Sequence, residues 1–210
     1  MWNKEYKKEK FYWGTKPEVG LKEVLRYAPK GIALDIGAGE GRNSIFLAKN
    51  GFRVEAIDKN EEGLKKCKKL AQKYNLRLKT KIADIRKFKF LRNKYSLIVA
   101  VASLDFLKFS EIKKIFLQIK KSLKKEGVFY LVAFSIKDPV FQKCKKKLKM
   151  AEKNTFYLPK FKTSRHFFEK KELLNLLRNL KIVKLKEEKI REKHKKRIHF
   201  HHLIKVIAKK

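Results

Sequence analysis

Residues 34–60 read LDIGAGEGRNSIFLAKNGFRVEAIDKN, and this stretch decides the fold. An apolar run leads into a loop with three alternating glycines (Gly37, Gly39 and Gly41), followed by a helical pattern, a second apolar run and Asp58. This order is typical of a parallel sheet whose first strand-to-helix loop binds a nucleotide-like cofactor. Glycines let the backbone approach a ligand closely, and the helix that follows presents free N–H groups to it.

The acidic residues around the loop indicate which cofactor it binds. A dinucleotide loop would read G-x-G-x-x-G, but here the third glycine comes one place early. Asp35 and Glu40 put two carboxylates beside the loop, which would repel a pyrophosphate and favour a cofactor that carries an ammonium and a sulfonium. Asp58 ends the second strand, where we expect it to bind a ribose diol, and Asp84 follows the third strand, where we expect it to accept a hydrogen bond from an adenine amino group.

Residue patterns along the chain predict one α/β domain, residues 1–210, without repeats or linkers. The expected helices are 17–27, 43–50, 60–74, 110–124 and 169–179, and the expected strands are 31–36, 52–57, 76–82, 95–102, 128–135, 181–188 and 199–208. This alternation predicts a doubly wound, mainly parallel sheet of seven strands. The last strand should be antiparallel and lie beside the fifth, because only a short linker, 189–197, precedes it.

The net charge of +36 is the most unusual bulk property of the chain. Such a charge can serve binding to RNA, DNA or another anionic surface. Lysines are nevertheless spread along every expected helix, so we favour a lysine-rich background composition with solvated charges.

The cysteine content and the apolar runs indicate a cytoplasmic protein. Cys67 and Cys144 are far apart and form no metal-binding motif, which argues for a reducing compartment and against a metal or a disulfide framework. No apolar run has the length of a membrane span, and the N-terminus lacks the apolar core of a signal peptide. We therefore expect a soluble protein without a membrane partner.

Three motifs, LDIGAGEGRNS (34–44), AIDKN (56–60) and IADIRKF (82–88), resemble those of class I S-adenosylmethionine-dependent methyltransferases. The Arg42–Asn43 pair and the ending HFHHLIKVIAKK are similar to the small methyltransferases of the tellurite-resistance type, and the resemblance extends over about residues 15–209. It implies S-adenosyl-L-methionine as the cofactor, with its methionyl group on Gly37–Gly39, its ribose on Asp58 and its adenine beside Asp84. The expected cofactor contacts are Asp35, Gly37, Ala38, Gly39, Gly41, Arg42, Asn43, Asp58, Lys59, Asp84, Ile85, Val101, Ala102, Phe106 and Trp13.

Methyl transfer is an in-line displacement that requires a positioned nucleophile and, for some acceptors, removal of a proton. The candidates for this role are His194, Arg197, His199 and His201, near the start of the last strand. His199 and His201 share one face of that strand, so either one could act as a base, while Arg197 could neutralise an oxyanion. For each histidine taken singly, a place on the surface of an edge strand is the more common role. His166 is expected to be a structural residue at the start of a helix.

Two segments outside the sheet are candidates for shaping the site. Residues 1–16 are a candidate lid, since Tyr12 and Trp13 either cover the cofactor or pack against a helix. Residues 136–168 are a candidate insertion on the substrate side, with basic and aromatic residues interleaved.

Three functions remain open on the sequence. The leading one is a methyltransferase acting on a small soft or anionic nucleophile, such as a chalcogen oxyanion or a thiol. The second is an RNA or protein methyltransferase that uses the basic surface, although the segment VASLDF after the fourth strand lacks the proline box common to enzymes that methylate base amino groups. The third is a non-catalytic protein that binds S-adenosylmethionine or RNA. The oligomeric state is left open.

Overall fold

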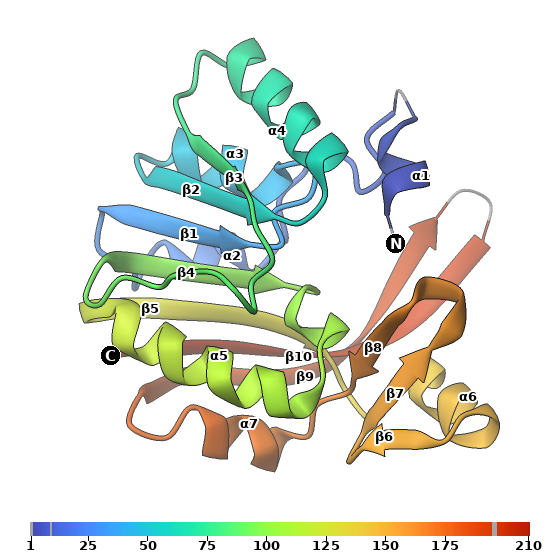
Figure 1. Cartoon of the computed structure of the whole chain (residues 1–210). Helices are drawn as coiled ribbons and strands as arrows, with labels where there is room; N and C mark the ends of the chain where they lie inside the picture. The colour runs from blue at the N-terminus through green and yellow to red at the C-terminus, as the bar shows by residue number, and fades with distance from the viewer. Residues whose placement is uncertain (1, 9, 195–196) are drawn as a thin grey trace.

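Seven strands form one sheet in the order β3-β2-β1-β4-β5-β10-β9 (Figure 1). The computed structural model describes residues 2–8, 10–194 and 197–210, except for the side chains of residues 192–194 and 197. The strands are β1 (Ile32–Ile36), β2 (Arg53–Asp58), β3 (Lys79–Ile82), β4 (Tyr95–Val101), β5 (Leu123–Phe134), β9 (Lys181–His194) and β10 (Arg197–Lys209). β1 to β5 pair in parallel, and β10 runs antiparallel to both of its neighbours. The predicted sheet and the place of its last strand are confirmed.

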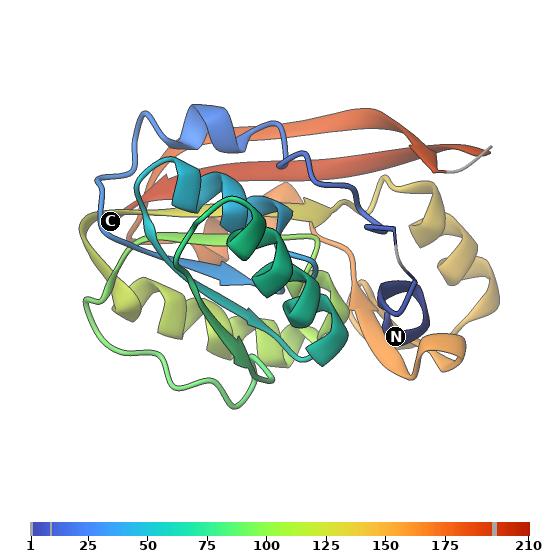
Figure 2. The same cartoon turned by 90° about the horizontal axis from the view of Figure 1, so that it is seen from above.

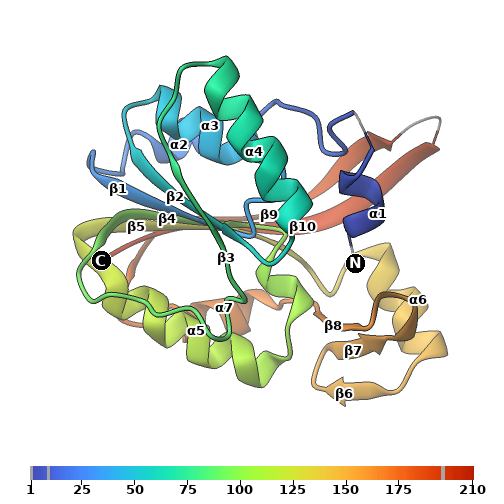
Figure 3. The ribbon, with the colours of Figure 1, turned by 45° about the horizontal axis from the view of Figure 1, so that its top comes forward.

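Helices cover both faces of the sheet (Figure 3). They are α2 (Leu21–Val24), α3 (Arg42–Lys49) and α4 (Glu61–Lys73) on one side, and α5 (Phe109–Ser122) and α7 (Lys170–Leu176) on the other. β4 is buried along nearly its whole length because alternate residues serve two cores. Ile98 and Ala100 pack with α5, while Leu97 and Val99 pack with the core beneath α2 and α3.

The start of α4 is set by a local signal as predicted, whereas the first expected helix is much shorter than predicted. Asn60 caps α4, and its side chain accepts a hydrogen bond from the Gly63 N–H at 3.0 Å. The helix expected over 17–27 is reduced to the four residues of α2. Before it, Glu18 is engaged with other elements, since its N–H donates to Asn43 and its carboxylate accepts the Tyr130 hydroxyl at 2.6 Å.

The carboxyl ends of the parallel strands meet at one edge of the sheet, and several short elements gather there (Figures 1 and 2). They are α1 (Asn3–Tyr6), η1 (Leu104–Phe106), α6 (Pro139–Lys147), β6 (Met150–Glu152), β7 (Thr155–Leu158), η2 (Pro159–Phe161) and β8 (Thr163–His166). β6, β7 and β8 form a separate antiparallel sheet. This small sheet packs with α6 around Phe141, Cys144, Phe156 and Phe167.

β9 and β10 continue past the sheet as a two-stranded ribbon (Figure 2). β10 pairs with β5 over Leu203–Lys209, whereas its earlier residues pair with β9 alone. The linker expected at 189–197 was therefore wrong, since its described residues belong to these strands. Among the described helices, none has the length and apolar character needed to cross a membrane.

Candidate functional site

The glycine loop lies at the carboxyl end of β1 and is fastened to the end of β2. The N–H groups of Gly37 and Ala38 both donate to the Ile57 carbonyl, at 2.9 and 3.0 Å. Gly37, Gly39 and Gly41 have φ values of 71°, 53° and 89°, a backbone conformation that side-chain-bearing residues rarely adopt. A Cβ on Gly41 would lie 2.3 Å from the Cys67 sulfur of α4, so the loop and this helix are in close contact. The loop geometry is fixed by the fold.

Asp58 is the carboxylate that ends β2 beside the loop. Its Oδ2 accepts the Gly39 N–H at 2.8 Å, and its Oδ1 accepts the Asn60 N–H at 2.8 Å. Burial raises its pKa, and these two hydrogen bonds oppose that rise. A carboxylate has about four lone-pair sites, so two acceptor sites remain for the hydroxyls of a ligand.

The other two acids of the loop have structural partners. Asp35 is buried, accepts the Ser44 hydroxyl at 2.6 Å, and burial raises its pKa to about 6. Glu40 is buried and forms an ion pair with Lys66 of α4 at 2.8 Å. Lys66 compensates the charge of Glu40. The sequence-based expectation that Glu40 attracts a cationic cofactor therefore has to be corrected. Its partner lies 26 residues away and could not be found from local spacing.

Glu40 fastens the N-terminal segment onto the loop. Its Oε2 accepts the backbone N–H groups of Tyr12 at 2.7 Å and Trp13 at 3.2 Å. The Lys66 ammonium donates in addition to the carbonyl oxygens of Lys8 at 2.6 Å and Lys10 at 3.1 Å. We call the described residues 2–8 and 10–13 the lid, after the role that the sequence predicts for this segment.

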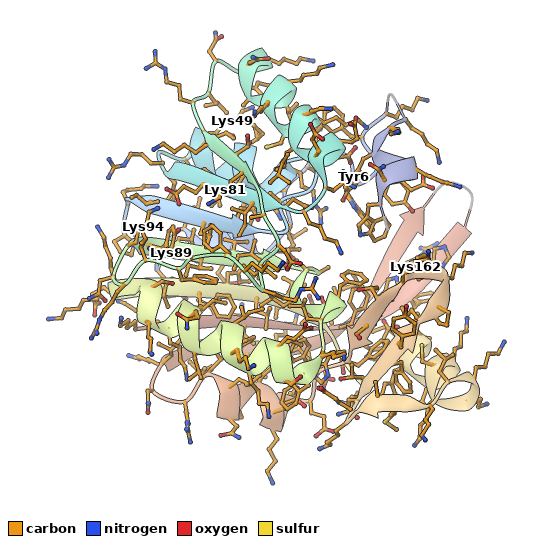
Figure 4. All side chains as sticks on the ribbon, viewed as in Figure 1. Tyr6, Lys49, Lys81, Lys89, Lys94 and Lys162 are labelled. Carbon is orange, nitrogen blue, oxygen red and sulfur yellow. The ribbon has the colours of Figure 1, made fainter. Side chains whose placement is uncertain are left out.

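The lid presents aromatic rings to the site. The rings of Trp2, Tyr6, Tyr12 and Trp13 pack together, and Trp2 also meets the Phe106 ring of η1 edge-on at 6.3 Å. Tyr6 is the last residue of α1 (Figure 4), and its hydroxyl would be 2.9 Å from a Cβ on Gly39 of the glycine loop. Both tryptophans of the chain belong to the lid.

Asp84, expected to bind an adenine, is engaged by a neighbour. The Arg86 Nε–H donates to both of its oxygens, at 2.9 and 3.0 Å, and this pairing lowers the pKa of Asp84 to about 2. Arg86 also reaches Glu111 of α5 at 3.4 Å. An adenine amino group would therefore share Asp84 with Arg86, while the adjacent Ile85 is half-buried.

The segment after β4 turns back toward the glycine loop. Ala102 has a φ of 46°, and a Cβ on Gly37 would lie 2.4 Å from the Ser103 Cβ. Val101 and Phe106 are half-buried on either side of this turn. The remaining expected contacts are placed as follows: Arg42 is half-buried, Asn43 is buried with its amide oxygen on Glu18, Lys59 is exposed, and Trp13 is 39% exposed.

The histidines expected in catalysis differ in their surroundings. His201 is half-buried, with its Nδ1 2.9 Å from Asp138 and its ring 5.1 Å from the Phe134 ring. His199 is exposed on the ribbon. The side chains of His194 and Arg197 lie outside the described residues. His166 is a buried structural residue as expected, but it ends β8, where Thr155 and Glu172 bind its two nitrogens at 2.8 and 2.6 Å.

Known proteins agree with this arrangement. The strand order, the antiparallel β10 and the loop between β1 and α3 define the fold of class I S-adenosylmethionine-dependent methyltransferases. The crystal structure of a methyltransferase of this kind from Methanosarcina mazei matches with a TM-score of 0.75 at 22% identity, over 92% of this chain and 98% of that one. That of TehB from Haemophilus influenzae matches with a TM-score of 0.72 at 19% identity, over 100% of this chain and 65% of that one.

The family follows from the sequence comparison. The model of the family described as tellurite resistance protein TehB matches residues 1–199, so the chain belongs to the TehB family. A curated relative from Haemophilus influenzae, named "Probable S-adenosyl-L-methionine-dependent methyltransferase TehB", is 31% identical over 107 residues. That match spans 51% of this chain and 37% of the relative.

Proposed function

We propose that this chain transfers a methyl group from S-adenosyl-L-methionine, by in-line displacement, to a small soft or anionic nucleophile such as a chalcogen oxyanion or a thiol. The observation that carries the proposal is the glycine loop with Asp58 at the neighbouring strand end, in a chain that the TehB family model matches over residues 1–199. When bound, S-adenosylmethionine supplies a methyl group already activated by its sulfonium.

The residues around the loop fit this cofactor. The free acceptor sites of Asp58 suit a ribose diol, and membership of the TehB family supports a methionyl group along the backbone of Gly37–Gly39. Asp84 and Ile85 would flank the adenine. The other proposed contacts are Asp35, Gly41, Arg42, Asn43, Lys59, Val101, Ala102, Phe106 and Trp13.

The protein's own part in the reaction is positioning and the exclusion of water. Hydrogen bonds from fixed backbone groups hold the loop and Asp58 before any ligand arrives, so little order is lost on binding. The lid puts aromatic rings over the same loop, and a dry site protects an activated methyl group from attack by water.

A transfer assay with methyl-labelled S-adenosylmethionine tests the proposal. The acceptors are tellurite, selenite, small thiols and total RNA, each incubated with the full chain. We expect label in volatile or thioether products and not in RNA. Label found in RNA alone would contradict the proposal and favour the second function, an RNA methyltransferase whose net charge of +36 holds the substrate.

A binding experiment separates the third function, a protein that binds the cofactor without turnover. Calorimetry with S-adenosylmethionine, run beside the transfer assay, reports binding whether or not any acceptor is methylated. Binding without transfer to any acceptor in the panel would leave a non-catalytic binding protein as the answer.

A further inference from the structure

Three buried side-chain atoms lack a hydrogen-bond partner among the described residues: the Ser103 hydroxyl oxygen, the Asp105 Oδ2 and the Arg165 Nε. Nearly all buried polar atoms in folded proteins are paired, so each exception calls for an explanation. These three come from two segments in contact, the turn into η1 and strand β8. Thr163 of β8 joins the two through a hydrogen bond to the Phe106 carbonyl at 3.2 Å.

Arg165 is a cation held by aromatic rings. Its guanidinium carbon lies 4.1 Å from the centroid of the Phe134 ring, 5.1 Å from that of Phe167 and 5.6 Å from that of Phe106. Burial lowers the pKa of Arg165, while the charges of Asp105 and Asp138 raise it. Ring contacts recover only part of the cost of burying a cation, so its free Nε–H is available to an anion that enters between the rings.

Asp105 supplies the opposite chemistry. It is fully buried, and its Oδ1 accepts the Phe134 N–H at 2.7 Å, which fixes the carboxylate and leaves Oδ2 free. Burial raises the pKa of Asp105 to about 6. The hydrogen bond from the Phe134 N–H and the electrostatic interactions with Arg165 and His166 of β8 act in the opposite direction and lower this pKa. A buried carboxylate with an open oxygen is an acceptor for a proton.

The cluster lies beside the proposed cofactor site. Ser103 is packed against Gly37 of the loop, since a Cβ on that glycine would lie 2.4 Å from the Ser103 Cβ. Phe106, one of the rings around Arg165, is also in contact with Trp2 of the lid. Ser103 thus joins the cluster to the loop, and Phe106 joins it to the lid.

We propose that Arg165, Asp105 and Ser103 form the acceptor site, and that it takes a small acid with one negative charge and one remaining proton on its nucleophilic group. The Arg165 Nε–H and the Ser103 hydroxyl donate to the anionic oxygen, and the Asp105 Oδ2 takes the proton. This inference rests on the proposed methyl transfer.

The step balances. A lone pair of the acceptor atom forms the bond to the methyl carbon while the carbon–sulfur bond of the donor breaks and leaves its pair on sulfur. The acceptor's proton passes to Asp105, so the acceptor keeps its single charge and the carboxylate becomes neutral. A hydrogen oxyanion or a thiol that carries a carboxylate satisfies these conditions.

Kinetics with paired thiols test the role of Arg165. The probes are 3-mercaptopropionate, which is anionic, and 2-mercaptoethanol, which is neutral. Arg165→Met should raise KM for the anionic thiol about tenfold and leave KM for the neutral thiol within about twofold, with Arg165→Lys intermediate. Arg178→Met, at an exposed arginine after α7, is the matched control and should behave as the unchanged protein.

The pH profile tests Asp105. In the unchanged protein kcat/KM should rise with pH through about 6, as Asp105 loses its proton and becomes able to accept one. Asp105→Asn should lower kcat about a hundredfold and remove this limb of the profile. His201→Gln should keep the limb. A limb that disappears in His201→Gln and persists in Asp105→Asn would overturn the assignment.

A binding measurement keeps this inference separate from the proposed function. Selenite binding, followed by the fluorescence of Trp2 and Trp13 in the lid, requires no methyl transfer. If no acceptor is methylated and selenite still binds about tenfold more weakly to Arg165→Met than to Arg178→Met, the proposed reaction fails and the anion site stands. Equal selenite affinity in the two variants, or an equal rise in KM for both thiols, overturns the anion site.

Discussion

The Asp58 carboxylate has two roles. It accepts a hydrogen bond from the glycine loop, and in the proposed function it also binds the ribose of the cofactor. In Asp58→Ala the hydrogen bonds from the Gly39 and Asn60 N–H groups are lost together with the acceptor sites for a ribose. Hydrogen bonds to charged groups contribute about 1.5–3 kcal/mol each. We expect calorimetry to show S-adenosylmethionine binding weakened at least tenfold, in a protein that still folds.

Asp58→Asn is the matched control for this variant. It keeps an acceptor of the same shape without the charge, so it should bind the cofactor more tightly than Asp58→Ala. Unchanged affinity in Asp58→Ala would exclude this residue as the ribose ligand.

Single residues also show how far the sequence could predict the site. Asp58 and the glycines stand out because their positions relative to the strands are local information. Arg86 lies two residues after Asp84, so this pairing was local information that the motif alone did not reveal. The partner of Glu40 was missed because it depends on how α4 packs against the loop. Arg165 and Asp105 were missed for a similar reason. Only the packing of β8 on η1 turns an ordinary arginine and an ordinary aspartate into unpaired buried groups.

At the scale of elements, the lid depends on one buried ion pair. Lys66→Met removes the cation that joins Glu40 to the Lys8 and Lys10 carbonyls. A charge that stays buried without its partner, here the Glu40 carboxylate, costs about 3–5 kcal/mol. Release of the lid exposes this carboxylate to water and so avoids the cost. We expect the tryptophan emission, which arises only from the lid, to shift to the red and become more accessible to acrylamide.

Lys69→Met on the same helix is the control, because Lys69 is exposed. Its emission should match that of the unchanged protein, and the circular dichroism of both variants should show the same sheet and helices. A lid that stays closed in Lys66→Met would show that aromatic packing alone holds it.

The elements that the sequence predicted are those buried by a regular pattern. The main strands and α4 and α5 have apolar residues at the spacing of a strand or a helix. β6, β7 and β8 have three or four residues each, which is too short for a period to show. The ribbon, residues 189–194 and 197–202, consists mostly of basic residues and histidines, a composition that suggested a solvated linker over its first half.

At the scale of the whole molecule, positive charge is distributed over many elements. Such lysines include Lys49 of α3, Lys81 of β3, and Lys89, Lys94 and Lys162 between elements (Figure 4). We expect weak binding to poly(U) that falls by about 10³-fold or more between 50 and 200 mM salt, as a purely electrostatic contact should. A filter-binding titration measures it, and methyl transfer to selenite should be unaffected by excess RNA at 200 mM salt. Tight binding that persists at 200 mM salt, or inhibition of transfer there, would indicate a dedicated RNA site.

Phe134, the last residue of β5, connects the proposed acceptor site to the main sheet. The Phe134 N–H belongs to the backbone of a central strand, yet it donates to Asp105, and the Phe134 ring lies against Arg165 and His201. The Phe134 peptide group is therefore part of the β5 backbone and also donates the hydrogen bond that holds Asp105. The Asp105 side of the proposed acceptor site is therefore held by the end of β5, whereas Arg165 belongs to β8 of the small sheet. Adaptation to different acceptors would then come from the lid and from the small sheet that carries Arg165, since changes in either leave β5 undisturbed.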